Sequence, residues 1–474
     1  MKLSGIKNLI LVLLAGFCLS LTFRLWFGSF NISAALSAPN NQSQNQSFVI
    51  DIPALTEIMV RPARIIRHHS DNFFTVTYSD ITASPEFILG SQIIGEVLRN
   101  GSHYSSAVIG DDELIQMFLN NSIIFEYNFS MPTDIFGSFF GQRGSLLSSQ
   151  TSGFDTLLIS SDEGSLRLVF FNRESRQNLV HTFYGESEGL SRIFAGLALQ
   201  AEAGGAVSEP VLLYRLSLLC FPHIFDNITF IPYWQGDLSF YPLYRHVPYS
   251  VLHLSAIRRF VLFLFPNPYA VISSNINNVF TYRDGYRTVM FYPSNVMTYS
   301  TTNRRDAQAA ATFTSSYFAA LDMVQRDASS MASLGTPMNQ VFLSGYHHIE
   351  GSNEWLFFFD YVADNLPIRF AEEFAREIML SHGIEVRVRG NTVVHYRRLL
   401  NNFNRNEAQE VSIANQSFED ALRILASTYD ITTANLQFRI TAESESILHW
   451  RINPNGIPQS IPVYFEPEEE FYGY

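Results

Sequence analysis

VFTYRDGYRTVMFYPSNVMTYS, residues 279–300, places aromatic and β-branched residues on both sides of the pair Asp284-Gly285. Such side chains favour strands. Asp-Gly between two such runs is a strong hairpin signal, because a tight type I′ turn needs positive φ angles. The stretch therefore predicts antiparallel strands joined by a short turn. The 41 Phe and 22 Tyr of the whole chain agree with a β-rich fold.

A helix and more strands are expected after this hairpin. Asn303 can cap a helix of about 28 residues. The apolar stripe of that helix should face a sheet and comprises Phe313, Tyr317, Leu321, Val324, Ala328 and Met331. Strand patterns follow at 341–349, 354–362, 384–389, 392–400, 436–442 and 447–452, with a turn at Gly390-Asn391 and a second helix capped by Ser417. Helix plus antiparallel strands thus occurs twice, which predicts an α+β fold of antiparallel sheets with packed helices.

The 474 residues are too many for one core and predict several domains. The polar run at 31–47 has no apolar period and is typical of a flexible tether. The run EAGGAVSEP at 202–210 marks a further boundary. The expected parts are a transmembrane anchor at 6–27, a polar tether at 28–48, an N-terminal extracytoplasmic domain at 49–202, a central domain at 203–302 and a C-terminal α+β domain at 303–474.

The N-terminal segment carries a clear membrane signal. Leu9 to Phe23 includes ten Leu, Ile, Val and Phe residues, and the apolar run continues toward the ~20 residues that a bilayer span needs. The lysines of the chain, Lys2 and Lys7, both precede this run. Basic residues stay on the cytoplasmic side. We therefore expect a single-pass protein of the cell membrane with a cytoplasmic N-terminus and an extracytoplasmic bulk.

Two other fates of this segment can be weighed from its residues. Bulky Phe17 stands directly before Cys18, where lipoprotein processing needs a small residue, so a lipoprotein is not expected. Signal-peptide cleavage after the small residues at 33–35 stays open as an alternative to an uncleaved anchor. Cys220 is the other cysteine of the chain, so the exported part is expected to fold without a disulfide.

The charge and the motifs argue against nucleic-acid binding and catalysis. A net charge of −13 makes the chain a poor partner for phosphates. Residues 185–189 match the G-x-S-x-G nucleophile elbow, but the glutamates flanking Ser187 would oppose an oxyanion. The pairs His68-His69 and His347-His348, the latter with Glu350, lie in strands, where neighbours point to opposite faces. The sequence therefore predicts no enzyme, no cofactor and no catalytic or metal-binding residues.

Three segments resemble the YycH family. They are IKNLILVLLAGFCLSLTFRLWF at 6–27, the hairpin at 282–287 with Tyr292 and Tyr299 after it, and GIEVRVRGNTVVHYRR at 383–398. The last segment departs from the family at its end, where Arg-Pro is expected. The family comprises bitopic proteins of low-GC Gram-positive bacteria. They act with the related protein YycI on the sensor histidine kinase YycG, also called WalK, which controls cell-wall metabolism.

The resemblance implies a membrane-anchored regulator whose three-domain outer part has no known enzymatic activity. It also implies contacts with the kinase and a YycI-like protein through the membrane helix and the outer domains. Gly16 and Ser20 lie four residues apart on one helix face, and such small residues allow a second helix to approach closely. Both are also common in any membrane helix. Together with the resemblance, they lead us to predict that Gly16, Ser20 and Phe23 face a partner.

Two other functions stay open at this stage. An anchored envelope-assembly or adhesion module would act through its outer domains and would tolerate an exchanged anchor. A cell-surface hydrolase built on Ser187 would cleave ester substrates and would lose that activity in Ser187→Ala.

Overall fold

The computed structural model describes residues 61–140, 153–184, 261–302, 312–333 and 340–405 with short gaps, and the strands at 213–216, 230–233, 237–240, 243–246, 411–414, 431–440, 445–454 and 459–462. Among these residues no helix is long and apolar enough to cross a membrane. The anchor predicted at 6–27 and the tether predicted at 28–48 lie outside the described residues. Residues Ile50–Tyr474 form one compact unit.

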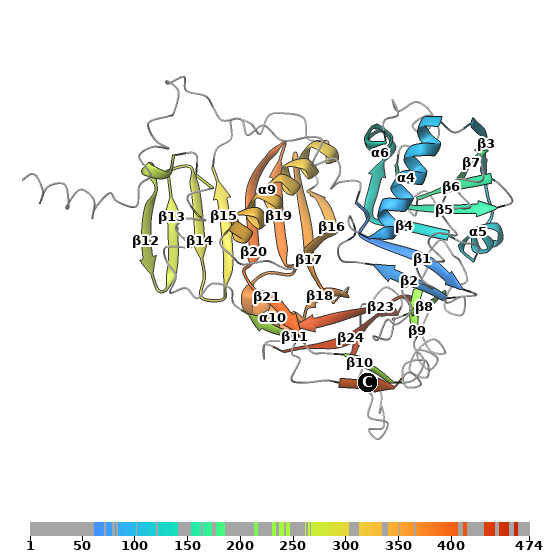
Figure 1. Cartoon of the computed structure of the whole chain (residues 1–474). Helices are drawn as coiled ribbons and strands as arrows, with labels where there is room; N and C mark the ends of the chain where they lie inside the picture. The colour runs from blue at the N-terminus through green and yellow to red at the C-terminus, as the bar shows by residue number, and fades with distance from the viewer. Residues whose placement is uncertain are drawn as a thin grey trace, which may run out of the picture. The chain divides into compact units, whose positions relative to one another are not determined.

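Nine strands form the first sheet, in the order β3-β7-β6-β5-β4-β1-β2-β8-β9 (Figure 1). All neighbouring strands in it are antiparallel. The strands are β1 (Arg64–Ser70), β2 (Phe73–Thr77), β3 (Ser102–Val108), β4 (Ser122–Pro132), β5 (Gly153–Asp162), β6 (Ser165–Asn172), β7 (Gln177–Tyr184), β8 (Leu213–Leu216) and β9 (Phe230–Tyr233). The helices between them are α4 (Pro85–Asn100), α5 (Asp111–Phe118) and α6 (Thr133–Phe139).

The first sheet is covered by helices on both faces. Side chains alternate along a strand, so Ile65 and Phe125 join one buried cluster with residues of α4 and α6. Their neighbours Ile66 and Ile124 join a second cluster with residues of α5. This arrangement explains why β1, β4 and β5 are apolar at successive positions and do not alternate with polar residues.

Helix α4 begins at a capping signal formed by Ser84 and Pro85. Ser84 accepts a hydrogen bond from the amide of Phe87 at 3.2 Å through its side-chain oxygen. Pro85 occupies the first helical position, where its missing amide hydrogen costs nothing. The pair Ser84-Pro85 therefore fixes where the helix starts.

The second sheet has 14 strands and follows the order β12-β13-β14-β15-β20-β19-β17-β18-β23-β24-β11-β21, with β16 paired to β17 and β25 paired to β24. Eight of its strands are β12 (Ile272–Ile276), β13 (Val279–Arg283), β14 (Arg287–Phe291), β15 (Val296–Thr301), β16 (Gln340–Ile349), β17 (Glu354–Ala363), β19 (Ile384–Arg389) and β20 (Thr392–Leu399). The others are β11 (Leu243–His246), β18 (Leu366–Phe370), β21 (Asn402–Arg405), β23 (Ile431–Ile440), β24 (Glu445–Pro454) and β25 (Gln459–Pro462).

The remaining elements are a separate strand pair and two helices. β10 (Asp237–Phe240) pairs with β22 (Val411–Ala414). Helix α9 spans Phe313–Ser333 and α10 spans Glu372–Ile378. Apart from the parallel pair β18–β23, the strand pairs among the described residues are antiparallel. The predicted α+β fold of antiparallel sheets with helices is therefore confirmed for these residues. The division at 49–202, 203–302 and 303–474 stays a prediction.

The predicted hairpin at 279–300 forms strands β13 and β14, but its turn differs from the expected type. Gly285 has a φ of +90°, whereas Asp284 does not have a positive φ. The Asp284 side chain instead accepts hydrogen bonds from the amides of Tyr286 and Arg287 at 3.1 and 2.7 Å. A type I′ pattern with two positive φ angles occurs at Asn277-Asn278, between β12 and β13.

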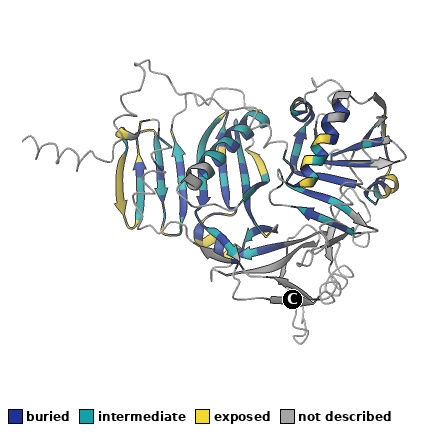
Figure 2. Cartoon of the chain, viewed as in Figure 1, coloured by how far each residue is buried: buried dark blue, intermediate teal, exposed yellow. Residues whose placement is uncertain are grey.

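Helix α9 packs on β17, β19 and β20 through the predicted stripe (Figure 2). Tyr317, Leu321 and Val324 of that stripe are buried. The helix starts later than predicted, because Thr312 caps it: its hydroxyl oxygen accepts a hydrogen bond from the Ser315 amide at 3.1 Å. Asn303, the predicted cap, lies outside the described residues.

Candidate functional site

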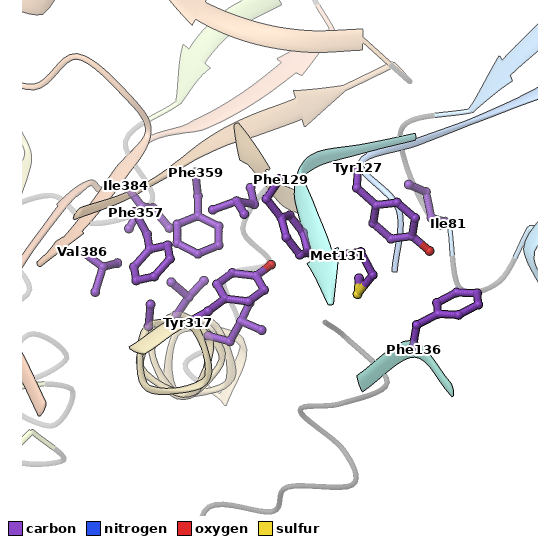
Figure 3. Packing of buried hydrophobic residues seen from close by; sticks show 14 of the residues in the cluster. Ile81, Tyr127, Phe129, Met131, Phe136, Tyr317, Phe357, Phe359, Ile384 and Val386 are labelled. Carbon is purple, nitrogen blue, oxygen red and sulfur yellow. The ribbon is translucent and has the colours of Figure 1, made fainter. Parts of the chain in front are cut away.

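Aromatic side chains connect the first sheet to the second. Phe129 of β4 lies with its ring centroid 5.2 Å from that of Tyr317 and 5.6 Å from that of Phe313, both on α9. Tyr317 in turn lies 5.5 Å from Phe357 of β17. Figure 3 shows Tyr317 between Phe129 and Phe357. We call these four residues, Phe129, Phe313, Tyr317 and Phe357, the aromatic junction.

The aromatic junction belongs to a buried cluster that contains residues of both sheets. Burial raises the pKa of the Tyr317 phenol well above its ordinary value. A polar contact reinforces the junction, because Arg61 donates a hydrogen bond to the carbonyl of Val341 at 2.8 Å. The two sheets therefore share one buried apolar cluster at the aromatic junction.

A buried ion pair lies under α9. Arg398 of β20 and Tyr396 both donate hydrogen bonds to the same carboxylate oxygen of Asp327. The side chains of Arg398 and Asp327 are only 1% and 0% exposed. Burial alone would lower the pKa of Arg398, but the charge of Asp327 holds it well above its ordinary value. Helix α9 is thus tied to β20 by charge as well as by apolar packing.

The other three arginines of the segment 383–398 have acidic partners within the second sheet. Arg387 and Arg389 both bind Glu354, which is almost fully buried on β17. Arg397 lies 3.2 Å from Glu385 on the neighbouring strand. Burial by itself would raise the pKa of Glu354, and the two arginines reverse this and lower it. These pairings give the segment a structural role in holding β17, β19 and β20 together.

A serine, a histidine and an aspartate come together at one point of the second sheet. The Nδ1 atom of His382 lies 3.1 Å from Asp360 and 3.4 Å from the Ser344 hydroxyl. In a catalytic triad the serine and the aspartate bond to different ring nitrogens of the histidine. Here both face Nδ1, and the Ser344 hydroxyl donates to the carbonyl of Phe358 at 3.2 Å. This geometry gives Ser344 no base to activate it, so the cluster is a structural one around the buried Asp360.

Asp360 predicts a stability change at low pH. Burial raises its pKa, but Arg369 and then His382 outweigh burial and hold the pKa at about 2, against an ordinary value of 3.8. A carboxyl with a depressed pKa stabilises the fold above its ordinary pKa and loses that contribution as the pH falls through 2. We expect Asp360→Asn to be less stable than the wild type by about 2 kcal/mol at pH 6, with the gap closing between pH 4 and pH 2.

Urea denaturation of both proteins across this pH range measures the gap. Asp322→Asn is the matched control, since Asp322 forms a partly exposed pair with Arg326 on α9 and should change stability little at any pH. A gap between wild type and Asp360→Asn that stays constant down to pH 2 would contradict the assigned role of Asp360.

The structure places some of the sequence-predicted residues and leaves others outside the described part. His347 is exposed, and His348 packs its ring 4.5 Å from that of Trp355, so the two histidines do not converge. The described residues contain no group of three or more potential metal ligands. Ser187, with its flanking glutamates, and the predicted partner-facing residues Gly16, Ser20 and Phe23 lie outside the described residues.

Known proteins provide an independent comparison. The sequence matches the YycH protein, N-terminal domain, over residues 4–193. The fold is similar to that of YycH from Bacillus subtilis, with a TM-score of 0.52 and 16% identity, over 86% of this chain and 97% of that chain. An uncharacterized protein from Eubacterium rectale aligns with a TM-score of 0.29 and 9% identity over 47% of this chain and 82% of that one, and supports no conclusion. Curated proteins include none that match significantly.

The two informative matches agree with each other and with the segments in which the sequence resembles this family. The match at 4–193 covers the first sheet up to β7. The shared fold extends over the second sheet, because it includes most of the chain. Residues 4–193 therefore belong to the YycH N-terminal domain family, and the chain as a whole shares the fold of a YycH protein.

Proposed function

We propose that the chain is a non-enzymatic regulatory protein of the cell membrane that modulates a YycG-like sensor histidine kinase together with a YycI-like partner. The observation that carries the proposal is the YycH N-terminal match, which begins at residue 4 and so includes the predicted anchor at 6–27. Family membership supports a regulatory role. The geometry of Ser344, His382 and Asp360 supports the absence of a triad at that point.

Regulation of a kinase by such a protein requires differential binding. A sensor kinase switches between packed helix arrangements, and a partner shifts that equilibrium only if it binds one arrangement more tightly. A tenfold change needs a difference of about 1.4 kcal/mol. Close helix packing at Gly16 and Ser20 can supply this difference. The outer domains, coupled through the aromatic junction, would orient the anchor and could bind a further ligand.

A pull-down from detergent-solubilised membranes of the native host tests the proposal. The wild-type chain is compared with a chain whose residues 1–27 are replaced by an unrelated membrane helix, and bound proteins are identified by mass spectrometry. We expect the wild type to recover a sensor kinase and a second bitopic protein, and the exchanged anchor to lose them. Recovery of no kinase by the wild type would contradict the proposal.

Gly16→Leu is expected to impair regulation without unfolding the outer domains. The added side chain keeps a partner helix at a distance, which should shift the output of a kinase-dependent reporter by roughly tenfold. Cys18→Leu is the matched control, because it adds a similar side chain half a turn away. Reporter output equal to the wild type from a membrane-inserted Gly16→Leu chain would rule out this contact face.

A further inference from the structure

Strand β12 forms a free edge of the second sheet. Within the described residues it pairs with β13 and with no other strand. All five of its residues are exposed, as the yellow strand in Figure 2 shows. Natural edge strands usually carry charges, prolines or bulges that prevent further pairing. The sequence of β12, Ile-Ser-Ser-Asn-Ile, has no charge and no proline, and its register with β13 is regular.

The backbone of β12 is arranged to accept another strand. Asn277-Asn278 forms a two-residue turn, so its flanking residues Ile276 and Val279 form a hydrogen-bonded pair. Hydrogen-bonding directions alternate along an antiparallel strand. The amide and carbonyl groups of Ser273 and Asn275 therefore point away from β13, toward the outer edge.

Apolar side chains are exposed on β12 and in the turns beside it. Four of the eight large hydrophobic side chains that are exposed among the described residues belong to β12 or to its immediate surroundings: Tyr269, Ile272, Ile276 and Tyr286. Ile272 and Ile276 are 64% and 69% exposed. Ile272 pairs with Arg283, which precedes the turn that carries Tyr286, so these two side chains lie at the same end of the strand. Ile272 and Ile276, four residues apart in the strand, therefore expose apolar side chains on one face of β12.

The order of residues in β12 indicates which strand pairs with its free edge. In an antiparallel pair centred on Ser274, Ile272 lies opposite Ile276 of a second copy, and Ser273 lies opposite Asn275. On one face Ile272 then meets Ile276 and Ser274 meets Ser274, and on the other face Ser273 meets Asn275, so that like meets like at every position. This self-complementarity is the requirement of a two-fold interface. We propose that two copies of this chain pair through β12, in antiparallel register centred on Ser274, and form a sheet that continues across the dimer.

The pairing is weak in dilute solution. Five residues per copy cover less than the ~800 Å² per partner of a standard interface. Confinement to a membrane raises the effective concentration and compensates for this. The test therefore uses the full chain in membranes. The proposal goes beyond kinase regulation and does not depend on it, but it rests on the membrane anchor of the proposed function.

Charges placed at Ser274 test the register. Two copies with different tags are co-expressed, and co-purification is measured. Lysine opposite lysine, or glutamate opposite glutamate, opposes pairing across the two-fold axis. Since Ser274 is exposed, neither change should disturb folding. We expect Ser274→Lys and Ser274→Glu each to reduce co-purification about tenfold, and a mixture of the two variants to restore it. Undiminished co-purification of Ser274→Lys copies, or no recovery in the mixture, would overturn the proposal.

Cysteine cross-linking provides a second readout. At the centre of the pairing the two Ser274 residues form a non-hydrogen-bonded pair with Cα atoms about 4.5 Å apart, within the range of a disulfide. In a chain with Cys18→Ser and Cys220→Ser, oxidation of Ser274→Cys should give a band of twice the monomer mass. Ser105→Cys is the control, because Ser105 is also exposed and lies on β3, an edge strand of the first sheet. If Ser274→Cys and Ser105→Cys cross-link to the same extent, the disulfides arise from random collision, and the proposed pairing is wrong.

Discussion

Asp327→Ala is expected to lower the free energy of unfolding by about 3–5 kcal/mol. The substitution leaves the guanidinium of Arg398 charged and buried without its carboxylate, since both side chains are at most 1% exposed. Tyr396 also loses the acceptor of its hydroxyl. Chemical denaturation of the purified full chain, followed by circular dichroism, measures the loss.

A matched substitution on the same helix separates burial from charge. Asp322 pairs with Arg326 on α9, and the two side chains are 24% and 23% exposed. An i,i+4 pair of this kind contributes only about 0.3–0.5 kcal/mol. Asp322→Ala should therefore change stability by less than about 1 kcal/mol. A similar loss in both variants would show that Asp327 acts through helix propensity or general charge and not through its buried partner.

Removing both charges provides the decisive comparison. Apolar residues often replace a buried ion pair without loss, because the desolvation of both ions is avoided. We expect Asp327→Leu combined with Arg398→Met to recover most of the stability, with a remaining deficit of about 1–3 kcal/mol from the unpaired Tyr396 hydroxyl. A double variant as unstable as Asp327→Ala would contradict the assignment of the loss to an uncompensated charge.

The buried ion pair also shows where sequence reasoning ends. Alternation in the segment 383–400 predicts strands β19 and β20, and it places Tyr396 and Arg398 on the same face. It does not show that this face is buried, because an arginine in a strand normally points to solvent. The partner of Arg398 is 71 residues away on α9. Asp327 itself lies three residues after Val324 of the predicted stripe, and an acid at that spacing is the signal that could have revealed it.

Turns and helix ends were predictable to different degrees. Asp284-Gly285 correctly predicted a hairpin, but the Asp284 side chain supplies hydrogen bonds that a type I′ turn does not require. The start of α9 was predicted at Asn303, and Thr312 caps it instead, since capping residues are common and their competition is decided by packing. The pair Ser84-Pro85 is a clear signal for the start of a helix, and it marks where α4 begins. The partner-facing role of Gly16, Ser20 and Phe23 stays a prediction.

Tyr317→Ala is expected to cost about 3–5 kcal/mol and to weaken the connection between the two sheets. The ring of Tyr317 is buried and contacts Phe129 of the first sheet and Phe357 of the second (Figure 3). Its removal leaves a cavity between β4 and β17 that neither sheet can fill alone. Hydrogen exchange should therefore show lower protection in both strands. Tyr317→Phe is the control, because it keeps the ring and should change stability by about 1 kcal/mol or less.

The contact between Phe129 and Tyr317 can be isolated by a double-mutant cycle. Phe129→Ala, Tyr317→Ala and the double variant should give a coupling energy of about 0.5–1.5 kcal/mol, the usual value for an aromatic pair. Such coupling means that each sheet is more stable when the other is folded. A partner that binds one sheet would then change the stability of the other. A coupling energy near zero, with hydrogen-exchange protection lost in β17 and retained in β4, would contradict this. The two sheets would then be in contact but not energetically coupled.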